Sequence, residues 1–408
     1  LAICWNNLND HPKAVTLLKD NLEKARAAGL PDLLGPINTA LARVYRKLNE
    51  CAICRDYAEK ALADFRSTGD WLGMAEAYRE IAISYHQEGR SERSIEYFQL
   101  GIEIIGDRSA PFMLGKIYTD MSGAYWFLRQ PKKGIECLER SVAFFEKTEH
   151  VLNSVIAYNN LGINLMLIGE WPRAEAMIRR ALELALPTKH VHVAGILDSL
   201  GELNILREEF DSAERNLNEA VAIARRENRL WYEVQALRNL ARLYLAKGEP
   251  GRAEEIARDN IEKCRQIGDK HYANMSGLVL AESLLVQGRN AECTNYLEIV
   301  EESNPGSDYF VLGNIQRIRG LAAAAEGDIQ VAIHHLRRAL THFEAAGDIY
   351  YTALANYLIG KYLPGDQFES ATAHLSQAID GFRSLNVNSL LKAAEAERRR
   401  LETTVSVR

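Results

Sequence analysis

Apolar residues recur every three or four positions along most of the chain, and short polar turns interrupt them at regular intervals. Ile178, Ala181 and Leu182 form one such stripe, and a similar stripe begins at Leu336. Residues at this spacing share one face of an α-helix, whereas a half-buried strand alternates apolar and polar positions. Alternation of the strand type is essentially absent, so the pattern predicts an all-α protein.

The polar turns follow one another at a nearly constant distance. Similar stretches surround Gly169, Gly248 and Gly327. A sequence pattern that recurs at a fixed period of some tens of residues is typical of repeat proteins. Extending the spacing gives ten anchor positions, 39 or 40 residues apart: Asn9, Asn49, Gly89, Arg129, Gly169, Glu208, Gly248, Gly288, Gly327 and Asp366. We expect a tight turn between two helices at each anchor, where glycine, asparagine or aspartate tolerates left-handed backbone angles.

Two further positions hold small residues in every repeat. Five residues after the anchor stand Ala14, Cys54, Ser94, Gly134, Ala174, Ala213, Ala253, Cys293, Ala332 and, displaced by one residue, Ala371. Seven residues before it stand Ala2, Ala42, Ala82, Ser122, Gly162, Gly201, Ala241, Ala281, Gly320 and, displaced by one residue, Gly360. Small side chains let two helix axes approach to ~8–10 Å. We therefore predict that the two helices of each repeat cross at these positions.

This order of small residue, aromatic residue, turn and small residue resembles the tetratricopeptide repeat over nearly the whole chain. In six of the repeats an aromatic residue stands four positions before the anchor: Trp5, Tyr45, Tyr85, Tyr125, Tyr244 and Tyr362. The family period is ~34 residues, and the longer period here adds about one helical turn to most helices. Long repeats of this kind are similar to those of bacterial signalling and transcription regulators and of spindle-orientation scaffolds. The resemblance implies a right-handed superhelical α-solenoid of about ten helix-turn-helix repeats, with the first helices lining a concave groove.

We expect the repeat array to occupy residues 1–387, and residues 388–408 to form a C-terminal helix and tail. Leu391, Ala394 and Leu401 would give that helix one apolar side, which suits a cap that closes the exposed end of an array. The alternative is the start of a helical connector to a downstream domain.

The other end of the chain suggests that the sequence is part of a larger protein. Ala2 occupies the small position of a first helix, so that this helix would lack roughly its first two turns. We therefore expect further residues before Leu1.

Composition restricts the partners that the chain can have. Its 408 residues are 47% hydrophobic and 25% charged, which is ordinary for a folded protein. The net charge of −6 argues against a dedicated nucleic-acid surface. No apolar stretch approaches the ~20 residues that span a bilayer. Six cysteines are too few for a disulfide scaffold, so we expect a reducing, cytoplasmic setting without membrane contact.

No motif of metal or catalytic chemistry stands out. Cys51 and Cys54 form a CxxC pair, but no second pair of metal ligands is nearby and no βαβ unit surrounds them, so we expect both to pack. Two histidine pairs, His190 with His192 and His334 with His335, do not converge on one helix face. The motifs of phosphate-binding loops, nucleophile elbows and zinc proteases are absent. We therefore predict a non-enzymatic protein without a metal or cofactor.

The resemblance places the candidate binding residues at four inward positions, which lie ten, nine, six and three residues before each anchor. The partner-binding candidates are Arg43, Arg46, Arg79, Trp126, Asn159, Asn160, Asp198, Arg238, Asn239, Arg242 and Arg317, and His86 and Glu202 lie at the same positions. Asparagine is a poor helix former, but its amide both donates and accepts, which suits the clamping of an extended peptide backbone.

Two features of this face leave alternatives open. Arg238 and Arg242 lie one turn apart and could bind a carboxylate of a partner, or they could simply bond Asp198 and Glu202 of the neighbouring repeat. The eighth repeat carries the apolar patch Leu278, Val279 and Leu285, which could receive a hydrophobic side chain or could pack.

These observations predict a scaffold that binds a partner peptide or protein segment in the concave groove, within a larger signalling or regulatory protein. The alternative is the effector-sensing domain of a transcription regulator, which would bind a small ligand or a signalling peptide. Neither function needs direct contact with nucleic acid.

Overall fold

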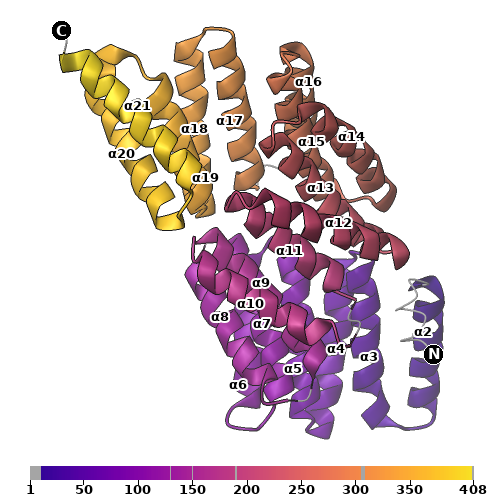
Figure 1. The fold of residues 1–408 in the computed structure, drawn as a ribbon. Coiled ribbons are helices and arrows are strands. Elements are labelled where there is room, and N and C mark those ends of the chain that lie inside the picture. Colours follow the sequence, from indigo (N-terminus) through magenta and orange to yellow (C-terminus); the bar gives the residue numbers. More distant parts are fainter. Residues whose placement is uncertain (1–10, 129, 149, 189–190, 305–307, 407–408) are drawn as a thin grey trace. The chain divides into compact units, whose positions relative to one another are not determined.

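The computed structural model describes residues 11–128, 130–148, 150–188, 191–304 and 308–406 (Figure 1). Within these ranges the chain forms α-helices, one short 3₁₀ helix and no strand, so the prediction of an all-α repeat fold is confirmed. None of the described helices is long and apolar enough to cross a membrane.

The helices alternate between a first and a second helix of each repeat. The first helices are α3 (Pro31–Lys47), α5 (Trp71–Gln87), α7 (Pro111–Phe127), α9 (Val151–Leu167), α11 (Val193–Leu206), α13 (Leu230–Ala246), α15 (Lys270–Val286), α17 (Tyr309–Ala325) and α19 (Ile349–Tyr362). The second helices are α2 (His11–Ala27), α4 (Cys51–Thr68), α6 (Ser91–Ile105), α8 (Pro131–Phe145), α10 (Trp171–Ala185), α12 (Phe210–Arg226), α14 (Pro250–Ile267), α16 (Asn290–Ser303), α18 (Ile329–Ala346) and α20 (Phe368–Leu385). The last described helix is α21 (Asn388–Ser406).

Contacts divide the chain into two units, residues 1–157 and residues 158–408, which we call unit 1 and unit 2. The core of unit 1 joins α2 to α8 through apolar side chains such as Leu41, Phe98 and Ile117. Unit 2 has a core over α13 to α17 and another over α17 to α21. Each repeat thus buries its apolar face against its neighbours, as in other repeat proteins.

The turns between first and second helices adopt the predicted left-handed conformation at most anchors. Positive φ angles occur at Asn49, Gly89, Gly169, Glu208, Gly248, Gly288 and Gly327. Asn9 and Arg129 lie outside the described residues.

At Asp366 the prediction was wrong. Asp366 lies in the 3₁₀ helix Gly365–Gln367, after the extended residues Leu363 and Pro364. The ring of Pro364 fixes its φ angle and disfavours helical angles at the preceding residue, so α19 ends without the tight turn of the other repeats.

The predicted crossing of the two helices is present in the structure. Ala174, Ala213 and Ala332 on second helices are fully buried, and a Cβ atom on the facing glycine of the first helix would collide with the second helix. A Cβ on Gly201 would lie 2.5 Å from Leu217 Cγ, and one on Gly360 would lie 3.0 Å from Ala371 O. The small residues therefore set how closely the two helices approach.

The last helix, α21, packs along α20 through Ala394 and Leu401, which are 0% and 9% exposed, while Arg399 and Arg400 face solvent. Its first turn also reaches a turn of an earlier repeat within unit 2, because Ser389 N donates to Glu208 Oε2 at 3.3 Å. The aromatic rings of Trp171 and Tyr350 meet in the same region, with their centroids 6.4 Å apart. The final repeats of unit 2 thus contact its first repeats.

The close crossing predicts opposite effects of the same substitution at two glycines. In Gly162→Ala the new methyl group would overlap Ile178 and lie 3.0 Å from Ala174 O, so the free energy of unfolding should fall by ~1–3 kcal/mol. At Gly251, an exposed position of α14, the methyl group of Gly251→Ala meets no atom within 4 Å, so this variant should be neutral or stabilising by up to ~1 kcal/mol. Chemical denaturation of both variants measures the difference, and equal effects would contradict the crossing.

Candidate functional site

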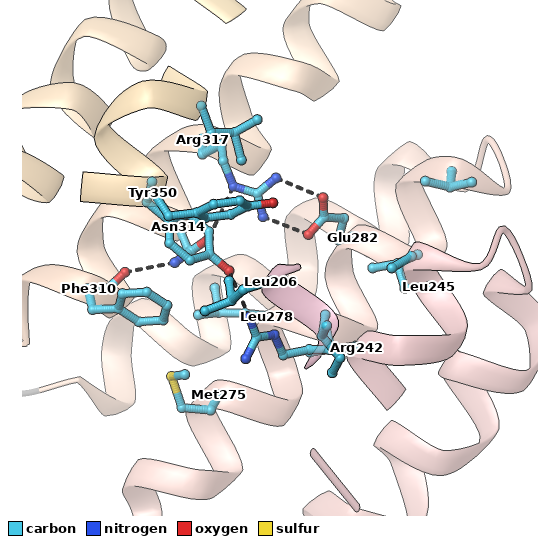
Figure 2. Close-up of a pocket in the computed structure, with 16 residues that line it drawn as sticks. Leu206, Arg242, Leu245, Met275, Leu278, Glu282, Phe310, Asn314, Arg317 and Tyr350 are labelled. Atoms are coloured by element: carbon cyan, nitrogen blue, oxygen red, sulfur yellow. Dashed lines mark hydrogen bonds and ion pairs between the residues drawn. The ribbon is translucent and has the colours of Figure 1, made fainter. Parts of the chain in front are cut away.

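A pocket of about 290 Å³ opens on the inward side of the first helices of unit 2 (Figure 2). Five consecutive first helices line it: α11 with Ile205 and Leu206, α13 with Arg242, Leu245 and Ala246, α15 with Met275, Leu278, Val279, Glu282 and Val286, α17 with Phe310, Asn314 and Arg317, and α19 with Tyr350, Tyr351 and Leu354. No second helix contributes a lining residue, so the pocket belongs to the face on which the sequence predicted binding.

Most of the lining is apolar. Met275, Leu278 and Val279 lie on successive turns of α15 and are each at least nine-tenths buried, while Val286 at the end of the helix is 61% exposed. The predicted apolar patch therefore lies partly in the pocket: Leu278 and Val279 line it, whereas Leu285 packs against the core of α13 to α17.

One buried ion pair lies at the wall of the pocket. Figure 2 shows the Arg317 guanidinium pointing at the Glu282 carboxylate, with two parallel hydrogen bonds of 2.7 and 2.6 Å. Arg317 Nε also donates to Asn314 Oδ1 at 3.1 Å. Burial would raise the pKa of Glu282, but Arg317 outweighs it and lowers that pKa. The fork of Arg317 is therefore occupied within the protein.

The second arginine of the pocket is held from three sides. Arg242 Nη1 donates to Glu202 Oε1 at 2.5 Å and to Asn239 Oδ1 at 3.0 Å. Its Nη2 donates to Tyr351 Oη at 3.3 Å, which joins α13 to α19. Arg242 thus links the walls of the pocket.

Neighbouring first helices α11 and α13 share a polar cluster beside the pocket. Arg238 Nη2 donates to Glu202 Oε2 at 3.1 Å, and Asn239 Nδ2 donates to Asp198 Oδ1 at 2.7 Å. Burial would raise the pKa of Glu202, but Arg238 and Arg242 lower it to about 2. At Asp198 burial prevails over Arg238 and raises the pKa to about 6. These contacts match the alternative in which the arginines bond the neighbouring repeat.

Unit 1 contains a similar network across α3, α5 and α7. Arg43 Nε and Arg46 Nε donate to the two oxygens of Glu80, each at 2.9 Å, and Arg43 also contacts Glu76. Arg79 Nε donates to Asp120 Oδ2 at 2.5 Å. Burial would raise the pKa of Glu76, but Arg79, Lys116 and Arg43 lower it to about 2.

The structure brings the predicted site residues together in two clusters. Asp198, Arg238, Asn239, Arg242 and Arg317 belong to unit 2, and Arg43, Arg46 and Arg79 belong to unit 1. Their role in binding a partner stays a prediction.

Three predicted residues belong to neither cluster. Trp126 on α7 and Asn159 and Asn160 on α9 are half-buried. Asn159 Oδ1 is buried and has no hydrogen-bond partner among the described residues. The half-exposed amide of Asn160 can both donate to a ligand and accept from it.

The five cysteines that the structure describes are buried, and one histidine of each predicted pair contacts a neighbouring side chain. Cys54 is fully buried in the core of unit 1, and burial raises the pKa of its thiol to about 12. His335 bonds the side chain of Gln316 at 2.8 Å, and the rings of His192 and Tyr232 meet edge to face. His190 lies outside the described residues. Among the residues that the structure describes, no three His, Cys, Asp or Glu side chains are grouped as metal ligands.

Sequence reasoning missed most apolar residues of the pocket. Met275 and Asn314 lie thirteen residues before their anchors, one turn beyond the inward positions considered, and reading one more turn would have found them. Tyr350 and Tyr351 enter the pocket because the last repeats approach α10 and α13, which the repeat period does not reveal.

Comparison with known families supports the repeat assignment. Profiles described as tetratricopeptide repeat match residues 35–105, 155–185 and 234–267. These parts of the chain therefore consist of tetratricopeptide repeats, as the residue pattern predicted. No curated protein matches the chain in sequence.

Several solved structures share the fold. The Rap conjugation gene regulator of plasmid pLS20, in complex with the Phr* peptide, is 15% identical, with 81% of this chain and 95% of that chain covered and a TM-score of 0.58. NprR in complex with its cognate peptide NprX is 13% identical, with coverages of 84% and 98% and a TM-score of 0.54. A human IFIT1 dimer with PPP-AAAA is 14% identical, with coverages of 98% and 89% and a TM-score of 0.53. At these identities the similarity establishes the fold alone.

The pKa of Asp198 predicts a pH-dependent effect of Asp198→Asn. Because burial raises that pKa to about 6, the folded chain binds this proton more tightly than the unfolded chain does. The resulting stability is complete below pH ~4 and is lost as the pH rises through about 6. Asparagine does not titrate, so the variant should gain on the order of 1–3 kcal/mol relative to the wild type between pH ~4 and ~7.

Urea denaturation at several pH values measures this change. Glu202→Gln is the matched control with the opposite sign, because the pKa of Glu202 is lowered to about 2 and its charge stabilises the fold above pH ~4.5. A constant difference between Asp198→Asn and the wild type at every pH would show that Asp198 is not a buried, protonated carboxyl group.

Proposed function

We propose that this chain is a non-enzymatic scaffold that binds a peptide or protein segment, and that the unit 2 pocket receives apolar side chains of that segment. The observation that carries the proposal is the pocket itself: a hollow on the inward face, lined mainly by aliphatic and aromatic side chains of five first helices. Apolar pockets that take anchor side chains dominate the affinity of many interfaces.

The polar residues of the pocket suit an orienting role. Arg242 and Arg317 are already paired, so a ligand gains little by offering them a carboxylate unless it displaces Glu202 or Glu282. Asn159 keeps a buried oxygen without a partner, and the half-buried Asn160 lies beside it on α9. These amides can hold the backbone of an extended segment while the pocket takes its side chains.

The structures of similar fold support this reading. The plasmid pLS20 regulator and NprR are each described in complex with a peptide. A signalling or regulatory role in the cytoplasm, within a larger protein, completes the proposal. A peptide or protein partner also agrees with the net charge of −6, because a nucleic-acid-binding protein normally carries an excess of basic residues.

A small effector is the second candidate. The pocket volume of about 290 Å³ is close to the lower end of the range for small-molecule sites, and the pocket combines an apolar lining with a few polar groups. Thermal shift against a panel of metabolites and short peptides separates the two candidates, because a ligand that binds only the folded state raises its stability.

Filling the pocket tests the proposal. Peptides selected from a random display library against the full chain should bind the wild type, and Leu278→Trp should weaken them by about tenfold or more, since the indole occupies the volume that the peptide needs. Val286→Asp places a charge at the exposed rim without altering the core, and should weaken the same peptides. Fluorescence anisotropy gives the dissociation constants.

The matched control is Val331→Trp, on the exposed side of second helix α18, which should leave binding unchanged. Unchanged melting temperatures would show that the variants fold. Selected peptides that bind Leu278→Trp and Val286→Asp as tightly as the wild type would refute the pocket as the binding site.

A further inference from the structure

A second surface of unit 2 combines an exposed tryptophan with uncompensated positive charge. It lies where α12 and α14 end and where α13 and α15 begin, and we call it the Trp231 surface. An open hollow of about 460 Å³ in this region is lined by Arg225, Asn228, Arg229, Leu230, Glu233, Lys263 and Gln266. None of the residues that line this hollow lines the inner-face pocket.

Two cations of this surface have no carboxylate partner, and the nearby carboxylate of Asp269, which precedes Lys270, accepts from Tyr272 N at 2.9 Å. Arg225 pairs with Glu233 at 2.9 Å, and Lys263 pairs with Asp259 at 2.9 Å. Arg229 and Lys270 are exposed and form no ion pair with any carboxylate of the described residues. Two free cations therefore remain on a chain whose net charge is −6.

Trp231 supplies the apolar part of the surface. It is 50% exposed in the first turn of α13, and its ring meets those of Tyr232 and Tyr272 edge to face, with centroids 5.0 and 6.3 Å away. These contacts hold the indole in one place and leave half of it open to solvent. Tryptophan and arginine are the side chains most enriched among residues that dominate protein interfaces.

The position of Trp231 within the repeat strengthens this reading. Seventeen residues before the anchor, the other repeats carry Asp32, Leu72, Phe112, Leu152, Val191, His271, Phe310 and Ile349. Packing between repeats therefore does not require an indole at this position. Trp231 is the largest side chain of the set, and Arg229 stands two residues before it.

We propose that the Trp231 surface docks an acidic segment of a partner protein, whose carboxylates pair with Arg229 and Lys270 and whose large apolar side chain lies against Trp231. Charge complementarity favours an acidic segment, because the positive charges of Arg229 and Lys270 attract its carboxylates during the encounter and pair with them in the complex. A single-stranded nucleic acid fits less well, because the stacking of successive bases needs several aromatic platforms.

The probe is a fluorescein-labelled peptide of glutamates around a central pair of leucines, added to the full chain at low salt. Arg229→Glu combined with Lys270→Glu should weaken binding by about tenfold or more, and added salt should weaken binding to the wild type. Trp231→Ser should also weaken it, and the same peptide with glutamine in place of glutamate should bind poorly.

The matched control reverses two exposed cations elsewhere, Arg66→Glu with Lys132→Glu, which changes the net charge equally and should leave the affinity nearly unchanged. Leu278→Trp, which fills the inner-face pocket, should likewise have no effect, and this separates the Trp231 surface from the proposed groove. The inference is overturned if the control weakens binding as much as Arg229→Glu with Lys270→Glu does. It is also overturned if a single-stranded oligoadenylate binds the surface more tightly than the acidic peptide.

Discussion

In both units, arginines of one first helix pair with carboxylates of a neighbouring first helix, and these pairs limit which groups of the face are free to bind a ligand. Arg242 reaches Glu202 on the preceding first helix, and Arg317 reaches Glu282 in the same way. A charge removed from water is tolerated only when a partner compensates it. Because donor and acceptor come from neighbouring first helices, each pair also fixes how one repeat sits on the next. The polar residues of the inner face thus hold the array together before any ligand arrives.

Because the arginines are already paired, the apolar side chains between them are the groups that remain available to a ligand. In unit 2, Met275, Leu278 and Phe310 line a hollow whose charged neighbours are already satisfied, so shape and apolar contact are left to attract a ligand. The Trp231 surface is the opposite case, since Arg229 and Lys270 have no carboxylate to hold them. Unit 2 therefore offers two surfaces of different chemistry, the apolar pocket and the Trp231 surface.

Much of the fold was predictable from the sequence because helix crossing requires small residues at fixed positions. Gly201 and Ala213 follow from that constraint, whereas the turn at Asp366 failed because Pro364 imposes its own backbone angles. The site was less predictable. The repeat period placed Arg238 and Arg317 on the inner face, but it could not show that Tyr350 and Tyr351 approach the same pocket, because contacts between distant repeats depend on small rotations that accumulate along the array.

A double-mutant cycle on Arg317 and Glu282 tests the central claim most directly. We expect Arg317→Met and Glu282→Met each to lower the free energy of unfolding by ~3–5 kcal/mol, because each leaves a buried charge alone, and the double variant to lose far less than the sum. The exposed pair Arg93 and Glu96 provides the reference, and its coupling should be far weaker than that of the buried pair. Additive losses at Arg317 and Glu282 would contradict the claim that paired charges hold neighbouring first helices together.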